Sequence, residues 1–254
     1  MVTEFSGGGD LRRSIDLLWG LPGPARRGPK PSRTVDEVVQ AAIVLADAEG
    51  LTAISIRRVA ESLGLSPMAL YTYVPSKAEL LDLMLDRVAA EREDTDAAPD
   101  GWRAKLEQVA RSGWDRARRH PWIMQVSAHR PPLGPNVLAR VEETLQAIDG
   151  LGLDELEMDR LTALVGDYVR GSIRAALEAR EVEQQSGITD EQWWALNGVL
   201  LKDLVSARDY PTTVRVGAAY KAASKGPDHA RNFEFGLQRV LDGIEVFIQR
   251  RNSA

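Results

Sequence analysis

The chain has 254 residues, no cysteine and a formal net charge of −5. The length allows two domains, and the absence of cysteine excludes disulfides, thiolate metal sites and thiol catalysis. No apolar run reaches the roughly eighteen residues that a membrane helix needs, and the N-terminus lacks the pattern of a secretion signal. We therefore expect a cytoplasmic protein that does not enter a membrane.

Residues 1–33 are expected to form a flexible basic N-terminal arm. Residues 11–19 have weak helical amphipathicity and could form a short helix, whereas residues 20–33 contain four prolines, three glycines and four cations and cannot bury a core. The segment is either a plain flexible leader or an arm that follows DNA or enters its minor groove. Its cations are Arg26, Arg27, Lys30 and Arg33.

The next residues predict two helices. Thr34 can cap the first helix, with Glu37 completing a capping box, and Gly50 can end it. Ser55 can cap the second helix, and Gly64 ends it in a tight turn. In both helices apolar residues recur at three- and four-residue steps, so each presents one face to a core.

A short third helix and a longer fourth helix follow. Ser66 can cap the third helix and Pro67 takes its first position, where the missing N–H costs nothing. The helix ends by residue 73, because Pro75 disfavours helix at the residue before it. Ser76 then caps a fourth helix from residue 77 to about residue 93. Two helices joined by a tight glycine turn predict a helix-turn-helix, whose second helix enters the major groove of DNA.

The third helix carries small, hydroxylic and aromatic residues. Small side chains let a helix approach base edges, and hydroxyls reach phosphates or bases. Lys77 follows at the start of the fourth helix, where a cation opposes the helix dipole, so we expect it to bind a phosphate. The alternative is a plain three-helix bundle with an incidental tyrosine-rich helix. The coincidence of caps, turn glycine and proline favours DNA binding.

The negative net charge is unevenly distributed along the chain. Between residues 25 and 77 there are seven cations against five acids, and the rest of the chain carries the acid excess. Such an excess would keep the distal part of the molecule away from phosphates.

The remainder of the chain is expected to be helical, which makes the protein all-α. The expected irregular connections are residues 128–135 and 209–228, and no strand-like alternation of any length is present. The expected helices cover residues 101–119, 121–128, 135–149, 154–185, 190–207 and 229–250. We expect a three-helix helix-turn-helix domain over residues 34–80 and a larger helical domain over residues 81–254.

Residues 34–86 resemble the DNA-binding domain of the TetR family of bacterial repressors. The match rests on "AEGL", "SIRRVAESLGLS" and "ALYTYVPSKAELLDLML". The resemblance implies a base contact from Arg57 and phosphate contacts from Tyr71 and Lys77. It implies groove-facing positions at Pro67, Met68, Ala69, Thr72 and Tyr73. Residues 67–69 depart from the polar residue often found at the start of this helix. We therefore expect few direct base hydrogen bonds and more readout through Arg57 and DNA shape.

The larger domain is similar to the ligand-binding and dimerisation domain of tetracycline-repressor-like proteins, through "HPW", "RPPLGPN" and "RNFEFGLQRVLDGIEVFI". The resemblance implies a small-molecule inducer and a homodimer formed by residues 154–185 and the last helix. The positions that serve a magnesium–tetracycline complex in the tetracycline repressor are Val126 and Ala175 here. Neither side chain binds a hard cation, so we expect no metal, no cofactor and no metal–tetracycline inducer.

Candidate inducer contacts are aromatic and polar residues near the connections of the larger domain. The alternative is that the aromatic residues are ordinary core, which we favour for Trp194. The three histidines are better explained as caps or cavity-lining groups than as bases, and no catalytic motif is present, so we expect no enzyme. The candidates are Trp122, Gln125, His129, Arg130, Tyr168 and Trp194.

The sequence therefore predicts a homodimeric, ligand-responsive regulator that binds a double-stranded DNA operator and is released from it by a small-molecule inducer. One alternative is a DNA-binding regulator without an inducer, whose C-terminal domain only dimerises. Another is a helical enzyme or carrier with no affinity for DNA. An apolar cavity with a few polar groups would favour the inducer.

Overall fold

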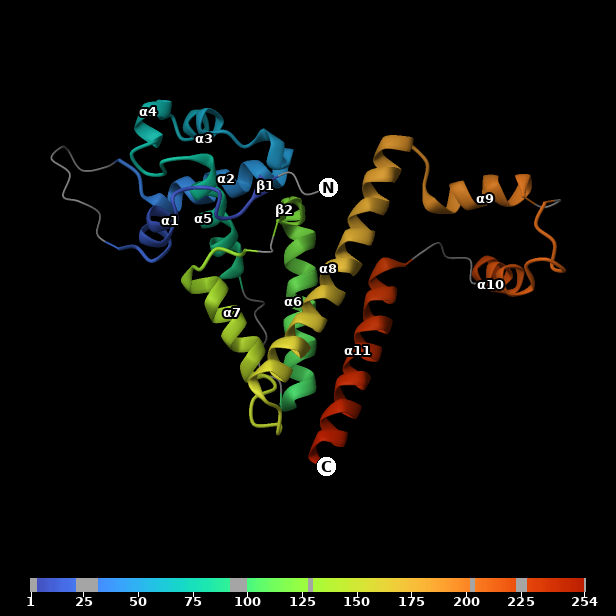
Figure 1. Cartoon of the computed structure of the whole chain (residues 1–254). Coiled ribbons are helices and arrows are strands. Elements are labelled where there is room, and N and C mark those ends of the chain that lie inside the picture. The colour runs from blue at the N-terminus through green and yellow to red at the C-terminus, as the bar shows by residue number, and fades with distance from the viewer. Residues whose placement is uncertain are drawn as a thin grey trace.

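A computed structural model describes residues 4–21, 32–91, 100–127, 130–201, 204–222 and 228–253. Apart from one pair of two-residue strands, every regular element in these ranges is helical, which confirms the all-α class. The elements before residue 90 are β1 Glu4–Phe5, α1 Leu11–Leu18, α2 Val35–Glu49, the 3-10 turn η1 Leu51–Ala53, α3 Ile56–Ser62, α4 Pro67–Leu70 and α5 Lys77–Ala89. We call α2 to α5 the head (Figure 1).

The rest of the described chain, which we call the body, is built on three long helices. Helix α8 packs along both α6 and α11, and α7 bridges from α8 back to α5 (Figure 1). Its elements are α6 Gly101–Arg119, the 3-10 turn η2 Pro121–Gln125, β2 Val126–Ser127, α7 Pro135–Gln146, α8 Glu155–Ser186, α9 Asp190–Leu200, α10 Pro211–Ala222 and α11 His229–Asn252.

The expected helix starts in the head are present with their caps. The backbone N–H of Glu37 donates to Thr34 Oγ1 at 3.1 Å and that of Thr34 donates back to Glu37 Oε2 at 2.7 Å, which completes the capping box. Ser66 caps α4, accepting from the N–H of Ala69 at 3.2 Å. Gly64 turns the chain between α3 and α4 at φ +67°, a conformation that side-chain-bearing residues rarely adopt.

Several expected elements differ from the structure. Where a helix was expected over residues 121–128, residues 121–125 form a 3-10 turn and residues 126–127 a strand, because Val126 and Ser127 pair in parallel with Glu4 and Phe5. This partner is too distant in the chain to be inferred from local periodicity. Residues 211–222, expected to be irregular, form α10, since a proline suits the first turn and alanine propagates helix. Helices α5 and α9 end earlier than expected, at Ala89 and Leu200.

The N-terminal arm is a larger correction. Residues 4–21, part of the arm expected to be flexible, fold as β1 and α1, with α1 against α5 and Leu18 in the core of the head. Helix α1 coincides with the short helix that residues 11–19 could form. Residues 22–31, which include Arg26, Arg27 and Lys30, lie outside the described residues.

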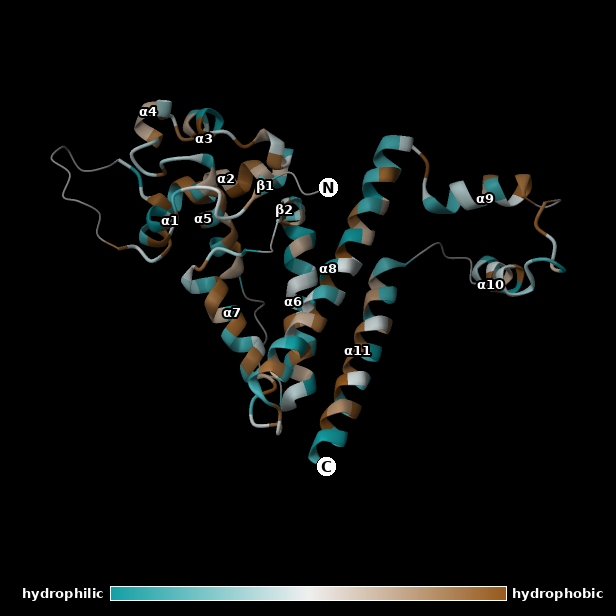
Figure 2. Ribbon diagram, viewed as in Figure 1, coloured by the Kyte–Doolittle hydropathy of each residue, from teal (hydrophilic) through white to brown (hydrophobic). Residues whose placement is uncertain are grey.

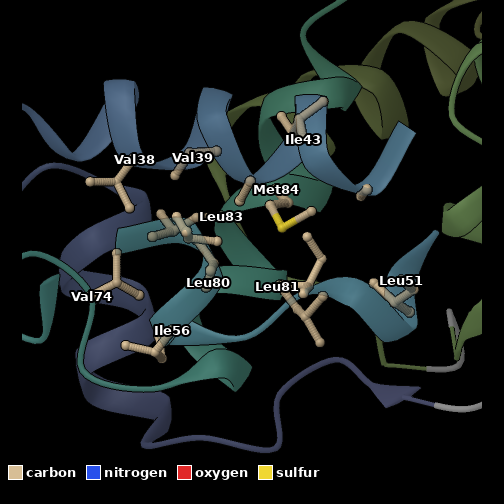
Figure 3. Packing of buried hydrophobic residues seen from close by; sticks show 14 of the residues in the cluster. Val38, Val39, Ile43, Leu51, Ile56, Val74, Leu80, Leu81, Leu83 and Met84 are labelled. Carbon is tan, nitrogen blue, oxygen red and sulfur yellow. The ribbon is translucent and has the colours of Figure 1, made fainter. Parts of the chain in front are cut away.

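The core of the head is closed by α5. Figure 3 shows Val38, Val39 and Ile43 of α2 packed against Leu80 and Met84 of α5. Every one of these side chains is at most 3 % exposed. Fully burying an aliphatic side chain contributes about 1.5–3 kcal/mol, so this contact is a principal source of stability for a domain of this size.

Three buried acids on α5 hold neighbouring segments. Glu79 and Asp82 accept hydrogen bonds from residues 6–14, and Asp86 accepts from the backbone N–H of Asn136 at 3.1 Å and of Val137 at 2.9 Å. Asp86 thereby caps α7 from another helix. The approach is so close that a Cβ at Gly134 would clash with the Asp86 carboxylate, so a side chain at Gly134 would disturb this cap.

The body has a separate core between α6, α8 and α11. Trp114 and Phe233 stack with ring centroids 4.4 Å apart. Beside them Arg111 binds Glu234 through two parallel hydrogen bonds, from Nε at 3.0 Å and from a terminal nitrogen at 2.8 Å. This pair fixes α11 to α6 with the specific geometry of a bidentate contact.

The Arg111–Glu234 pair predicts an acid dependence of stability. Hydrogen bonds from Arg111 lower the pKa of Glu234 below its ordinary value of 4.5. A lowered folded-state pKa gives stability that is present above the unfolded value and is lost as the pH falls through the folded value. Glu234→Gln should therefore be less stable than the wild type at about pH 7, and the difference should shrink below about pH 4. Urea unfolding followed by circular dichroism at several pH values measures this. A difference that stays constant with pH would contradict it.

Candidate DNA interface and ligand cavity

Helix α4 presents most of its predicted contact residues to solvent. Leu70 is fully buried and anchors the helix, whereas Met68 is 75 % exposed and Tyr71 is 44 % exposed. Pro67 and Thr72 are exposed, and Ala69 is half-buried. Helix α4 packs beside α3, so these residues lie next to the helix that carries Arg57.

Two predicted contact residues are already engaged by the protein. The hydroxyl of Thr72 donates to the carbonyl of Ala69 at 2.6 Å, so it can offer an oxygen lone pair to a donor on DNA. Tyr73 is half-buried, and its hydroxyl accepts from the backbone N–H of Arg33 at 3.2 Å. Tyr73 therefore fixes the start of α2 as well as facing the surface.

Arg57 lies at the start of α3 with an 80 % exposed side chain, paired to Glu61 at 2.8 Å. The hydrogen bond and charge of Glu61 raise the pKa of Arg57, so its guanidinium stays charged. An exposed pair of this kind contributes little to stability, so Arg57 can exchange Glu61 for a base or phosphate at small cost.

The structure gives Lys77 a partner that the sequence did not suggest. Its Nζ donates to Glu4 Oε1 at 2.6 Å, and both side chains are one-third exposed. Glu4 lies 73 residues away, so local spacing could not reveal this contact. Of the expected arm cations, Arg33 is described and pairs with Glu37 at 3.3 Å.

A cavity of about 370 Å³ lies where the head meets the body. Leu85, Val88 and Ala89 of α5 form one wall, and α6, η2, β2, α7 and α8 form the others. The lining is mostly apolar, with the donors of Arg116, Arg170 and a few hydroxyl groups among it. A largely apolar cavity of this volume with a few polar groups suits a small molecule.

A second cavity, of about 380 Å³, lies between α6, α8, the start of α9 and the start of α11. Its wall is more polar and includes Arg118, Arg180, Glu183 and His229. The two volumes are alike, so location decides between the cavities. Only the first of the two is lined by a helix of the head, so it is the better candidate for regulating DNA binding.

None of the described residues that we predicted to contact an inducer is in the lining of the first cavity. Trp122 is 1 % exposed and packs in the core of the head. Tyr168 stacks on Phe233 and donates its hydroxyl to the Phe233 carbonyl at 2.7 Å. Trp194 is 59 % exposed on α9, so it is not core either.

The remaining two described candidates, Gln125 and Arg130, are likewise absent from the lining of both cavities, and His129 lies outside the described residues. The lining of the first cavity comes mostly from apolar residues between α5 and α8. Gly166 on α8 is part of this lining, and no neighbouring atom fills the space beside it.

Trp122 and His120 join the head to the body. The indole Nε1 of Trp122 donates to Asp47 Oδ1 at 2.8 Å, and His120 Nδ1 lies 2.8 Å from the same oxygen. His120 Nε2 lies 2.9 Å from Glu91 Oε1. Asp47 belongs to α2, so the last turn of α2 is held by two side chains of the body. In the chain, His120 and Trp122 lie between Ala117 and Ile123, which both line the cavity.

No group of three or more metal-binding side chains occurs among the described residues. Of the two residues that the expected absence of a metal–tetracycline inducer rests on, Val126 is buried and Ala175 is exposed. Among the helices of the described ranges, none combines the length and the apolar character that a membrane crossing demands.

Comparison with known proteins identifies both parts of the chain. Residues 38–84 match the model of bacterial regulatory proteins of the tetR family, and residues 95–248 match the tetracyclin repressor-like C-terminal domain. The chain belongs to the TetR family. It is therefore a transcriptional regulator with a helix-turn-helix head, and the family is not one of enzymes.

Relatives extend along nearly the whole chain. The HTH-type transcriptional repressor DrrR1 of Streptomyces coeruleorubidus is 44 % identical over 250 residues, covering 98 % of this chain and 91 % of the relative. Apo ActR from Streptomyces coelicolor superposes with a TM-score of 0.69 at 27 % identity, covering 88 % of this chain and 99 % of ActR. ActR in complex with actinorhodin gives a TM-score of 0.68 at 27 % identity, over 84 % of this chain and 95 % of ActR.

The burial of Trp122 predicts a large loss of stability on truncation. Trp122→Ala should lower the free energy of unfolding by ~3–5 kcal/mol, because it opens a cavity in the head core. Trp122→Phe keeps most of the ring but removes the donor to Asp47, and should cost about 1–3 kcal/mol. Chemical denaturation of both variants measures this. A Trp122→Ala protein with wild-type stability would instead return Trp122 to the list of cavity residues.

Proposed function

We propose that this TetR-family regulator acts as a homodimeric repressor, and that a small apolar molecule in the cavity between α5 and α8 releases it from DNA. One observation carries the proposal. Helix α5 closes the core of the head with Leu80 and Met84, and its next turns, with Leu85 and Val88, form a wall of the cavity. A ligand that shifts this wall must move a helix of the head or strain its core.

For DNA binding, we propose that α4 enters the major groove while Arg57 reaches a base or phosphate from α3. The exposed surface of Pro67, Met68 and Tyr71 supports this assignment. These side chains offer few hydrogen bonds, so apolar contact with thymine methyls and DNA shape carry much of the readout. We assign the arm cations Arg26, Arg27, Lys30 and Arg33 to backbone phosphates, and Lys77 to a phosphate only when it leaves Glu4.

For the dimer, we propose that α8 and α11 pack against a second copy. Both helices leave large apolar side chains in solvent, which a soluble surface rarely gathers without a partner. Figure 1 shows α9 and α10 projecting from the body, and Figure 2 shows apolar segments along α9. The exposed apolar residues of α8 and α11 are Leu156, Leu164, Val182, Phe235, Val246 and Phe247.

The symmetry of such a dimer sets the geometry of its DNA site. Two heads reading successive major grooves must lie about 34–36 Å apart. A change in α5 that alters this separation by a few ångströms prevents both heads from binding at once. Because DNA of a bacterial operator lies in the cytoplasm, we place the regulator there.

For the ligand, we propose an apolar molecule whose polar atoms are mainly hydrogen-bond acceptors. The lining contains Arg116 and Arg170, and guanidinium groups donate but do not accept. Solved complexes of ActR, a structural relative, contain actinorhodin and (S)-DNPA. These complexes and the cavity favour an inducer over the alternative of a regulator whose body only dimerises.

Arg57→Ala should weaken operator binding and relax sequence preference at one position, at a cost of ~1–3 kcal/mol. The operator is obtained by selection from random duplex DNA with the wild-type protein, and affinity is measured by fluorescence anisotropy. Arg12→Ala is the matched control, because Arg12 is also exposed and paired with an acid four residues later. Equal affinity and preference in Arg57→Ala and wild type would exclude a DNA contact.

Gly166→Phe should block the cavity, since a side chain there projects into open space that the cavity occupies. The probe is 8-anilinonaphthalene-1-sulfonate, an apolar anion that fluoresces when it leaves water. We expect Gly166→Phe to lower its affinity by about tenfold, on the order of 1.4 kcal/mol. Gly171→Phe is the control on the same helix, equally open but outside the lining.

Unchanged probe binding in Gly166→Phe, or equal loss in both variants, would overturn the ligand site. A thermal-shift screen of apolar compounds, actinorhodin among them, then searches for the inducer through ligand-linked stabilisation. Light scattering on each variant confirms that its mass is that of a dimer.

A further inference from the structure

Residues 4–21, which we call the strap, lie outside the segments that match the family, 38–84 and 95–248. The strap nevertheless contributes buried groups. Ser6 and Ser14 are 8 % and 5 % exposed, and Leu18 lies in the core of the head. A segment with such burial is part of the folded molecule.

Four hydrogen bonds of the strap are accepted by two acids on the first two turns of α5. Asp82, only 2 % exposed, accepts hydrogen bonds from Ser6 Oγ at 2.9 Å, from the Gly7 N–H at 2.9 Å and from Ser14 Oγ at 3.0 Å. Glu79 accepts from the Asp10 N–H at 3.0 Å. A buried carboxylate needs such donors, because an unsatisfied buried charge is costly.

The same strap also binds the wall of the cavity at two places. Glu4 and Phe5 pair in parallel with Val126 and Ser127, and both of these β2 residues line the cavity. At the other end of the strap, Trp19 Nε1 donates to the Leu133 carbonyl at 2.9 Å. Leu133 follows directly on Pro131 and Pro132, which also line the cavity.

We propose that the strap couples the cavity to the head, with Asp82 as the positioning residue that fastens it to α5. The proposal rests on the proposed function, since the cavity must hold a ligand. A ligand that displaces β2 or residues 131–133 pulls the strap, and the strap acts on the first turns of α5, at the end of this helix far from the cavity. A ligand thus acts on α5 at both ends of the helix, directly through Leu85, Val88 and Ala89 and indirectly through the strap at Glu79 and Asp82.

The test measures amide exchange by mass spectrometry, with 8-anilinonaphthalene-1-sulfonate as the cavity probe. Hydrogen bonds of the Gly7 and Asp10 amides report the strap directly. In the wild type the probe should change exchange of residues 4–10 and of residues 77–82 by about threefold or more. In Ser6→Ala/Ser14→Ala, which removes two donors to Asp82, the change at residues 77–82 should disappear while probe affinity stays within about twofold.

Two controls separate the outcomes. Arg12→Ala alters the exposed face of α1 and should respond as the wild type does. Gly166→Phe should abolish the probe response everywhere; if it does not, the ligand site itself is refuted. The inference is overturned if the probe binds in the cavity but leaves the amide exchange of residues 4–10 unchanged. It is also overturned if the exchange of residues 77–82 changes as much in the double variant as in the wild type, because the strap then transmits nothing.

Discussion

The packing of α5 is the constraint on which the rest of the structure depends. Its apolar residues close the head core and then, within two turns, form part of the cavity wall. Its acids, Glu79, Asp82 and Asp86, hold the strap and the start of α7. The boundary that we expected between residues 80 and 81 falls inside this helix, so the two domains share it. A rigid element shared in this way cannot move for one domain alone.

A second link between head and body runs through Asp47. Its carboxylate receives Trp122 and lies beside His120, so the end of α2 is tied to the residues that follow α6. Because these two body residues stand between stretches that line the cavity, the same ligand would also alter this link. The head is therefore held at α2 and at α5, and rotation about either one is resisted by the other.

The sequence predicted what local chemistry determines. Thr34, Ser55, Ser66 and Ser76 each cap a helix as expected, because a cap depends on the three residues that follow it. The turn at Gly64 and the family resemblance followed from the same short-range patterns. The expected flexibility was wrong for residues 4–21. They fold through contacts with β2 and α5, and the composition of the segment does not reveal these contacts.

The contacts that the sequence did not reveal join residues that are distant in the chain. Lys77 with Glu4, Trp122 with Asp47 and β1 with β2 join segments at least 73 residues apart. The predicted inducer contacts are aromatic and polar residues, yet Trp122 lies in the core of the head and the lining of the first cavity is mostly aliphatic. A cavity is defined by where side chains are missing, and residue type alone carries little information about that.

The shared wall of the cavity also limits how this protein can diversify. A substitution of Leu85, Val88 or Ala89 that suits a new ligand also alters the helix that supports the DNA-binding unit. Residues of α7 and α8 such as Val141, Thr144 and Val165 line the same cavity without belonging to the head core. Variation among descendants that respond to different compounds should therefore accumulate on α7 and α8, while the α5 side of the cavity changes slowly. If this cavity holds the ligand as proposed, its wall on α5 is the conservative one and its wall on α7 and α8 the adaptable one.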